Sequence, residues 1–373
     1  MSKVLVMDSS YETCRDAVDR AFAAFPINVY GKRVAVKTNA LRACDPDREA
    51  LVTHYKLVKA VLDKIETLKP SEIVVGDSVG TDSYGRSEHV FQVCRQKEAA
   101  GPYYRNFNKY LSVVELNEPF KRKVALLRNI LEAEVYISVP KMKTHGLTMI
   151  SGAVKNNYGL LAGAQKSWFH YHSVGPKKFA RVIIELFRIR PPDLVIMDAV
   201  LAMEGYGPAS PETRWVNKIL ASDDAVALDT VEAKIVGFGV EDVPYLSLAR
   251  DLGLGPTDLK SIEVIGDAST IGEYHRPTPP ECSYSYKAGV GGGRASIEFF
   301  RKRVAYRPVI SAEKCPRECR ACVEACPSGA LSREPSKPVL DSSKCMICSA
   351  CKEACDSSAI ELQPDEKVMA ALA

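Results

Sequence analysis

Short runs of β-branched and aliphatic residues alternate along this chain with longer stretches in which apolar residues recur every three or four positions. The short runs predict strands at 3–7, 33–37, 72–76, 112–116, 134–139, 194–197 and 262–265. The longer stretches predict helices at 47–68, 122–132, 177–189 and 223–236. Strands that alternate with helices are typical of βαβ units, so we expect an α/β fold with a mainly parallel sheet and helices on both faces.

Polar residues stand where several of these strands end. Asp77 and Ser78 follow the strand at 72–76, Asp198 follows the strand at 194–197, and Asn39 comes shortly after the strand at 33–37. Ligands of open α/β sheets bind beyond the carboxyl ends of the strands, so we expect a ligand site there. For a single aspartate, capping of the next helix is the alternative interpretation.

Lysines are crowded near the same strand ends. Lys37 ends one predicted strand, and Lys141, Lys143 and His145 follow another. Neighbouring ammonium groups lower each other's pKa, which destabilises the fold unless an anion is bound. The pattern therefore predicts an anion site, with a solvated basic surface as the alternative.

The segment after these lysines extends the predicted site. Lys155, Asn156 and Asn157 lie among glycine and alanine residues, which allow the backbone to approach a ligand. Asparagine amides can both donate and accept hydrogen bonds. Glu204 lies in a turn-rich loop that follows the predicted strand at 194–197 and Asp198. It is a candidate acid or base.

Two further segments carry titratable groups whose role is open. His170 and His172 would share one face of a strand and could form a metal pair, with surface histidines as the alternative. In the helix predicted at 223–236, Ser222 or Asp223 is the expected N-cap. Asp224 and Asp229 could also face the site.

Eight cysteines between residues 315 and 355 form two runs that each end in C-x2-C-x3-C, the spacing of bacterial-type ferredoxin clusters. In two-cluster ferredoxins each cluster takes its fourth thiolate from the other run. The sequence therefore predicts two [4Fe-4S] clusters, one on Cys315, Cys319, Cys322 and Cys355, the other on Cys345, Cys348, Cys351 and Cys326. A pair of zinc knuckles is the alternative, although zinc sites usually use two separated cysteine pairs.

Residues 311–363 resemble the two-cluster bacterial ferredoxins more widely. Ser-Gly-Ala-Leu at 328–331 and Ser-Ala-Ile at 358–360 resemble the repeated short helix and strand of that fold. Two positions depart from the pattern: the Cys315 to Cys319 spacing is one residue longer than usual, and Asp356 stands where proline is common. The longer spacing bears on whether Cys315 completes its cluster.

The chain has 373 residues, of which 46% are hydrophobic and 26% are charged. This length favours two domains. We expect an α/β domain over 1–305, a ferredoxin-like domain over 306–366 and a tail over 367–373. The glycine-rich segment 288–294 would be a connector or an active-site flap.

Charge and targeting patterns limit the expected partners and location. The net charge is +4 without a marked lysine or arginine run, which argues against nucleic acid. We find neither a signal-peptide pattern nor an 18-residue apolar stretch, so we expect no membrane partner. Unpaired thiols and oxygen-sensitive clusters favour a reducing cytoplasm. A homodimer is possible.

Three sequence blocks resemble an iron–sulfur protein family known as domain of unknown function 362, whose members often carry a ferredoxin module. They are Pro-Lys-x-Lys-Thr-His at 140–145, Val-Lys-Asn at 154–156 and Asp-x-Val-Ala-x-Asp at 224–229. The resemblance covers about residues 30–300, and Ala225 departs from it where proline is frequent. It implies an iron–sulfur association and says little about the substrate.

Our first functional hypothesis is a ferredoxin-dependent oxidoreductase. Two [4Fe-4S] clusters would relay low-potential electrons from a donor such as ferredoxin to an anionic small molecule at the sheet edge. The expected catalytic residues are His145, Lys143, Asp198 and Glu204, with His145 as the proton donor because a histidine changes charge near neutral pH. The expected substrate-binding residues are Lys37, Asn39, Asp77, Ser78, Lys141, Lys155, Asn156 and Asn157.

Two alternatives remain from the sequence. One is an electron-transfer or accessory protein whose large domain docks a partner enzyme. The other is a lyase or isomerase with structural or substrate-binding clusters, which the unusual Cys315 spacing keeps open.

Overall fold

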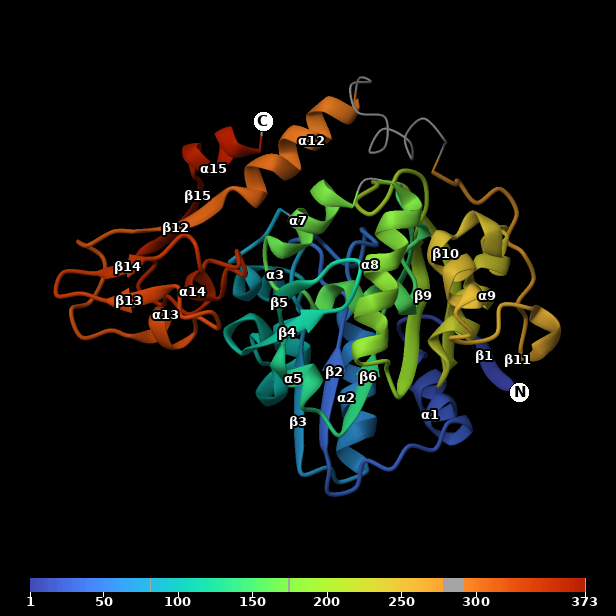
Figure 1. The fold of residues 1–373 in the computed structure, drawn as a ribbon. Helices are drawn as coiled ribbons and strands as arrows, with labels where there is room; N and C mark the ends of the chain where they lie inside the picture. The colour runs from blue at the N-terminus through green and yellow to red at the C-terminus, as the bar shows by residue number, and fades with distance from the viewer. Residues whose placement is uncertain (81, 174, 278–291, 373) are drawn as a thin grey trace.

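The structure, a computed structural model, describes residues 1–80, 82–173, 175–277 and 292–372. A large region built around one sheet comes first in the chain, and a smaller cysteine-rich region lies against one side of it (Figure 1). Most of the connector predicted at 288–294 lies outside the described residues.

The described part of the large region forms a sheet of nine strands. Seven of them run in the order β11 (Ile262–Ile265), β1 (Ser2–Asp8), β10 (Thr213–Ser222), β9 (Leu194–Met203), β6 (Val135–Ser138), β2 (Arg33–Lys37) and β3 (Glu72–Gly76). The other two are β7 (Lys141–His145), which pairs with β9, and β8 (Met149–Ile150), which pairs with β7. Most pairs are parallel, while β10 runs antiparallel to both β1 and β9. The predicted α/β class with a mainly parallel sheet is confirmed.

Helices cover both faces of this sheet because alternate strand residues point to opposite sides. In β1, Val4 and Val6 belong to one apolar core, whereas Leu5 and Met7 belong to the other. The helices α8 (Pro176–Ile189), α9 (Ala225–Ile235) and α10 (Pro244–Asp251) pack on the first core. The second core is covered by α1 (Cys14–Ala24), α2 (Tyr55–Thr67) and α3 (Ser87–Val93).

Shorter elements connect these layers. Between β3 and β6 the chain forms α4 (Gln96–Ala100), η1 (Gly101–Tyr103), η2 (Phe107–Lys109), β4 (Leu111–Leu116), β5 (Arg122–Leu127) and α5 (Arg128–Leu131). Between β8 and α8 it forms α6 (Ala153–Asn156), η3 (Asn157–Leu160) and α7 (Gln165–His172). Two 3-10 turns, η4 (Val240–Asp242) and η5 (Leu259–Ser261), precede α10 and β11.

The smaller region consists of two similar halves joined by antiparallel strand pairs. Helix α12 (Gly292–Val304) leads into β12 (Tyr306–Ile310), which pairs with β15 (Ile360–Pro364). Strands β13 (Leu331–Arg333) and β14 (Pro338–Leu340) form the second pair, and α13 (Ala321–Glu324) and α14 (Ala350–Glu353) carry cysteines. A final helix, α15 (Glu366–Ala371), occupies most of the segment that we expected to be a tail. This architecture is compatible with the predicted ferredoxin-like region.

Three local predictions were wrong. The segment 122–132 begins as β5, because it pairs with β4, and only its end is helical. The helix predicted from residue 47 starts at Tyr55, where the His54 side chain accepts a hydrogen bond from the Lys56 amide. The N-cap of α9 is Asp224, which accepts from the amides of Val226 and Ala227. Among the described residues we find no helix with the length and hydropathy needed to cross a bilayer.

The buried carboxylate of Glu353 joins the two regions. It accepts hydrogen bonds from the amide and hydroxyl of Ser87 and from the Asn106 side chain, with distances between 2.6 and 3.3 Å. Burial raises the pKa of Glu353, although these donors oppose the shift. An acceptor on α14 is therefore held by donors at the start of α3 and just before η2.

We predict that Glu353→Ala loosens this junction by about 2–4 kcal/mol, because the substitution leaves buried donors without an acceptor. Hydrogen–deuterium exchange in residues 85–93 should accelerate, while exchange in the β2–β6 core should not change. Glu334→Ala removes an exposed carboxylate from the same region and serves as the control. Equal exchange in both variants would contradict this role of Glu353.

Candidate functional site

The site begins with an ion pair at the carboxyl ends of two adjacent strands. In the parallel pair β2–β3, Lys37 lies opposite Gly76, so Asp77 emerges beside it. The Lys37 Nζ lies 2.7 Å from Asp77 Oδ1, and both side chains are almost completely buried. The second carboxylate oxygen of Asp77 accepts from the Ala40 amide at 2.7 Å, which fixes the loop after β2.

A cavity of about 440 Å³ opens around this pair. Eight of the predicted site residues line it: Lys37, Asn39, Asp77, Ser78, Lys143, His145, Lys155 and Asn156. The sequence did not single out several others, among them Tyr158, Lys166, Tyr206, Phe299 and Phe300. Four lysines therefore share one cavity with Asp77 and, at the rim, Asp82.

Two of the cavity lysines are tied down by neutral oxygen atoms. Lys166 Nζ donates to the carbonyl and hydroxyl of Ser78 and to the Val79 carbonyl, at 2.7–2.8 Å. Lys143 Nζ donates to Asn39 Oδ1 at 2.6 Å and to the Leu51 carbonyl at 3.1 Å. These contacts orient the ammonium groups but do not neutralise their charge.

Lys155 is held more loosely. Its Nζ lies 3.3 Å from Ser151 Oγ and 5.9 Å from the centre of the Tyr158 ring. The side chain is partly buried and lines the cavity, so its ammonium group is the one best placed to meet a ligand.

The lysines have lowered pKa values because they are buried together. Burial is the main cause for Lys143, Lys155 and Lys166, and it lowers the pKa of each to about 7. Neighbouring ammonium groups add to the effect, while Asp77 opposes it for Lys143 and Lys166. Burial also lowers the pKa of Lys37 despite the Asp77 partner. Ammonium groups with too few carboxylate partners favour the binding of an anion.

His145 is neutral at pH 7, which contradicts the reason for choosing it as the proton donor. Burial lowers its pKa well below the ordinary value, and Lys155, His170 and Lys143 add to the shift. Its Nδ1 lies 3.1 Å from the Leu147 amide, which donates to it. The neutral ring therefore carries its proton on Nε2 and can donate one hydrogen bond. Three cavity lysines, Lys143, Lys155 and Lys166, have pKa values near neutral pH instead.

Asn156 links the strand ends to the segment that carries Lys155. Its amide nitrogen donates to Ser138 Oγ at 2.9 Å, and its amide oxygen accepts from Lys37 and Asn39 at 3.3 and 3.2 Å. The side chain thus uses both its donor and its acceptor, as expected for an asparagine in a polar site.

Asp229 lies behind this segment and does not line the cavity. Its carboxylate accepts from the amides of Ala153 and Val154, the first residues of α6, at 2.5 and 3.0 Å. Burial raises the pKa of Asp229 to about 7 and that of the adjacent Glu232 well above its ordinary value. Asp229 therefore positions α6, and with it Lys155 and Asn156.

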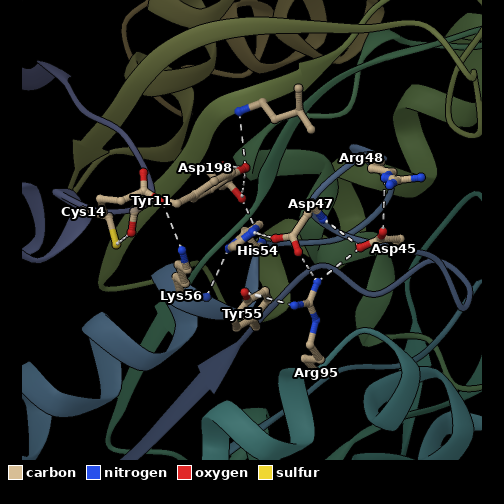
Figure 2. Close-up of polar contacts among 12 residues, drawn as sticks. Tyr11, Cys14, Asp45, Asp47, Arg48, His54, Tyr55, Lys56, Arg95 and Asp198 are labelled. Atoms are coloured by element: carbon tan, nitrogen blue, oxygen red, sulfur yellow. Dashed lines mark hydrogen bonds and ion pairs between the residues drawn. The ribbon is translucent and has the colours of Figure 1, made fainter.

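Lys141 and Asp198 form a separate buried network. Lys141 Nζ lies 2.9 Å from both Asp198 Oδ2 and the Tyr11 hydroxyl. Asp198 also accepts from the His54 amide at 2.8 Å, and the His54 ring stacks on Tyr11 (Figure 2). The pairing of β7 with β9 shifts register between Lys141 and Lys143, and only Lys143 lines the cavity.

Glu204 and Asn157 are also outside the cavity. Glu204 pairs with Arg214 at 2.7 Å and accepts from the His275 amide at 3.1 Å. Asn157 accepts from the Tyr136 hydroxyl and donates to the Arg190 carbonyl, both at 2.8 Å. Both side chains therefore have partners that hold loops and helices together.

The predicted pairing of His170 with His172 on a strand is wrong, because both lie on helix α7. Residues two apart on a helix point in different directions. His170 lines the cavity and lies 2.9 Å from the Tyr158 hydroxyl, whereas His172 stacks on Trp168. Burial lowers the pKa of His170 to about 4, so it is neutral at pH 7.

The eight cysteines of the smaller region come together in two groups of four. Cys326, from the first run, lines one small cavity with Cys345, Cys348 and Cys351 from the second run. Burial raises the pKa of Cys348 to about 12, and the neighbouring Cys345 and Cys326 contribute.

The other four cysteines form the second group. Burial raises the pKa of Cys322 to about 11, with further contributions from Cys315, Cys355 and Cys319. Backbone amides donate to two sulfurs, Ala330 to Cys326 and Ala359 to Cys355, both at 3.2 Å. Thiols that raise each other's pKa favour a cationic metal–sulfur group between them, because it would stabilise the thiolates. No three described His, Cys, Asp or Glu side chains approach closely enough for a single metal ion.

We predict that Lys155→Met stabilises the ligand-free protein by about 1–3 kcal/mol at pH 7, because it removes a poorly paired charge. The folded-state pKa is about 7 and the ordinary value is 10.5, so the folded protein binds fewer protons between these values. The gain should therefore be largest at or below pH 7 and disappear towards pH 10.5.

Chemical denaturation measured across this pH range tests the prediction, with the exposed Lys177→Met as the control. Inorganic phosphate should stabilise the wild type more than Lys155→Met. Destabilisation by Lys155→Met at pH 7 would show that this ammonium group is already well paired.

Comparison with known proteins agrees with the sequence blocks described above. Over 238 aligned residues the chain is 29% identical to the thylakoid-associated protein sll1697 of Synechocystis sp.. The alignment covers 61% of this chain and 70% of the relative. Residues 34–234, more than half of the chain and the part that contains most of the lysine-lined cavity, match the family described as "Domain of unknown function (DUF362)". The chain belongs to this family.

Proposed function

We propose that this protein is an iron–sulfur oxidoreductase that reduces an anionic small molecule bound in the lysine-lined cavity, with a ferredoxin or similar protein as electron donor. The two cysteine groups would hold two [4Fe-4S] clusters, on Cys315, Cys319, Cys322 and Cys355 and on Cys326, Cys345, Cys348 and Cys351. Such clusters, when bound, supply single electrons at low potential. The crossed grouping, in which each run lends one thiol to the other, supports this assignment.

One contact carries the proposal: the cysteine loop of the smaller region touches the start of α7. The Ala164 amide donates to the Ile347 carbonyl at 2.9 Å, beside Cys348. Gly163 lies so close that a Cβ there would come within 2.4 Å of the Cys348 carbonyl oxygen. Lys166, two residues after Ala164, reaches the cavity. A short stretch of chain thus connects a thiol group to the anion site.

The residues around this contact are buried and packed together. Tyr84, Ala164 and Ile347 form a small apolar cluster, against which Trp168 and Cys345 pack. The Tyr84 hydroxyl bonds to Ser167 Oγ at 2.9 Å, and burial raises the pKa of Tyr84. A packed and water-poor junction favours electron transfer, because little solvent has to reorganise when charge moves.

The cavity residues have complementary tasks in such a reaction. Lysine ammonium groups would hold the anionic group of the substrate. Because the pKa values of Lys143, Lys155 and Lys166 lie at about 7, these residues can also give up a proton when the substrate gains electrons. The neutral His145 would donate a hydrogen bond to the substrate. Asp77 opposes the lowering of the Lys37 pKa by burial and holds the Lys37 ammonium group in place.

A reducing compartment such as the cytoplasm suits this activity. The cysteines of the large region that the structure describes, Cys14, Cys44 and Cys94, are free and buried. The sulfurs of Cys44 and Cys94 lie 3.8 Å apart, without a disulfide bond between them. Proteins of reducing compartments rarely contain disulfide bonds, so these free cysteines agree with such a location.

Reoxidation of the reduced protein tests the proposed function. The anaerobically purified protein is reduced with dithionite, freed of excess reductant, and mixed with a protein-free extract of small anions while visible absorbance is followed. Reoxidation by the extract alone, weakened in Lys155→Met, is the expected result. Reoxidation that requires a protein partner and is unaffected in Lys155→Met would instead identify an electron carrier.

We further predict that Gly163→Ala slows this reoxidation at least about tenfold while leaving phosphate binding unchanged. The added methyl group would press on the Cys348 carbonyl, and Gly163 has a positive φ of 57° that disfavours alanine. Gly272→Ala is the control, because nothing lies within 4 Å of a Cβ at that exposed position. Unchanged electron transfer in Gly163→Ala would separate the cysteine loop from the reaction.

A further inference from the structure

The cavity is larger than an inorganic anion requires. A water molecule occupies roughly 30 Å³ of liquid volume, and phosphate is only a few times larger. The cavity of about 440 Å³ falls in the range of sites that hold whole organic molecules. A ligand that fills this space would need a larger organic part in addition to its anionic group.

The lining changes from charged to aromatic between the interior and the opening. Lys37, Lys143 and Lys166 are at most 5% exposed, so they lie deep in the cavity. Tyr206 is 38% exposed, and Phe299 and Phe300 are partly exposed, so these rings lie towards solvent. A ligand that enters with its anionic group first would leave its remaining part against the aromatic rings.

We call Tyr206, Phe299 and Phe300 the aromatic wall of the cavity. Contacts of the two phenylalanine rings with their neighbours hold these rings in place. The ring of Phe300 stacks on His170 with centroids 4.7 Å apart and an interplanar angle of 17°. Phe299 stands nearly perpendicular to Phe300, at 5.2 Å and 88°. Arg303 lies over the Phe299 ring at 3.3 Å and pairs with Asp82 at 3.1 Å. These contacts fix the orientation of the two rings, and a further flat ring can stack on such rings or pack against them edge to face.

His170 joins the aromatic wall to the charged interior. It is neutral, its Nδ1 lies 2.9 Å from the Tyr158 hydroxyl, and its ring packs on Phe300. Tyr158 in turn lies next to the Lys155 ammonium group. The two halves of the lining are thus parts of one continuous surface.

We infer that the ligand of this cavity is an aromatic anion, a compound in which a carboxylate or phosphate group is attached to a flat ring. The lysines bind the anionic group, and Phe299, Phe300 and Tyr206 bind the ring. This inference rests on the proposed function, because it concerns the same cavity, but it also specifies the apolar part of the substrate.

Binding of phenyl phosphate, inorganic phosphate and phenol to the oxidised full-length protein tests the inference by calorimetry. Phenyl phosphate should bind at least about tenfold more tightly than inorganic phosphate, since burial and stacking of a ring contribute about 1.4 kcal/mol or more. Phenol should bind more weakly than phenyl phosphate. Phe300→Ala should remove the preference for phenyl phosphate without weakening phosphate binding, whereas Lys155→Met should weaken both. Tyr30→Ala, at a ring that is 73% exposed, is the control.

The outcomes distinguish this inference from the proposed function. Equal affinities for phenyl phosphate and inorganic phosphate would contradict the inference of an aromatic ligand but leave the anion site intact. An equal loss of affinity for both compounds in Phe300→Ala would have the same meaning. If neither phenyl phosphate nor inorganic phosphate binds, the cavity is not an anion site. Phe300→Leu, which keeps an apolar side chain but removes the ring, gives the same comparison if the alanine variant does not fold.

Discussion

Burial of several ammonium groups beside Asp77, the one deep carboxylate among the described residues that line the cavity, is the constraint on which the rest of this site depends. Asp77 can neutralise Lys37, but Lys143, Lys155 and Lys166 are left with neutral partners. Desolvated cations without counter-ions destabilise a fold, so a bound anion that balances their charge would stabilise it. Hydrogen bonds to Ser78, Asn39 and Ser151 keep these three ammonium groups in place until an anion binds.

The architecture explains why this charge lies next to the cysteine-rich region. The carboxyl ends of β2 and β3 supply the first lysine and the carboxylate, and α7 supplies Lys166 from the other side. The first residues before α7 contact the Cys348 loop, and α12 brings its phenylalanines over the opening. The buried lysines, the cysteine loop and an apolar wall thus come from separate segments that meet at or beside one cavity.

Part of this arrangement could be predicted from the sequence, because the carboxyl ends of parallel strands meet at one edge. Lys37, Asp77 and Lys143 were identified in this way, whereas Lys155 was identified from its position among glycine and alanine residues. The sequence could not show that Lys141 and Lys143 have different surroundings. The difference follows from the register shift between β7 and β9, which places Lys141 beside Asp198. Lys166 lies in a segment without clear periodicity, and the aromatic wall comes from a helix more than 100 positions further along the chain. Such contacts depend on tertiary packing, which local sequence patterns do not encode.

Titration of the lysine side chains by NMR, in protein labelled at lysine and assigned with single Lys→Met variants, tests the central claim most directly. In the absence of anions, Lys143, Lys155 and Lys166 should titrate at about 7 rather than at 10.5. Saturation with phosphate should raise these pKa values, because a bound anion stabilises the ammonium form. Lysines that titrate near 10.5 with and without phosphate would contradict the claim that this cavity is an anion site.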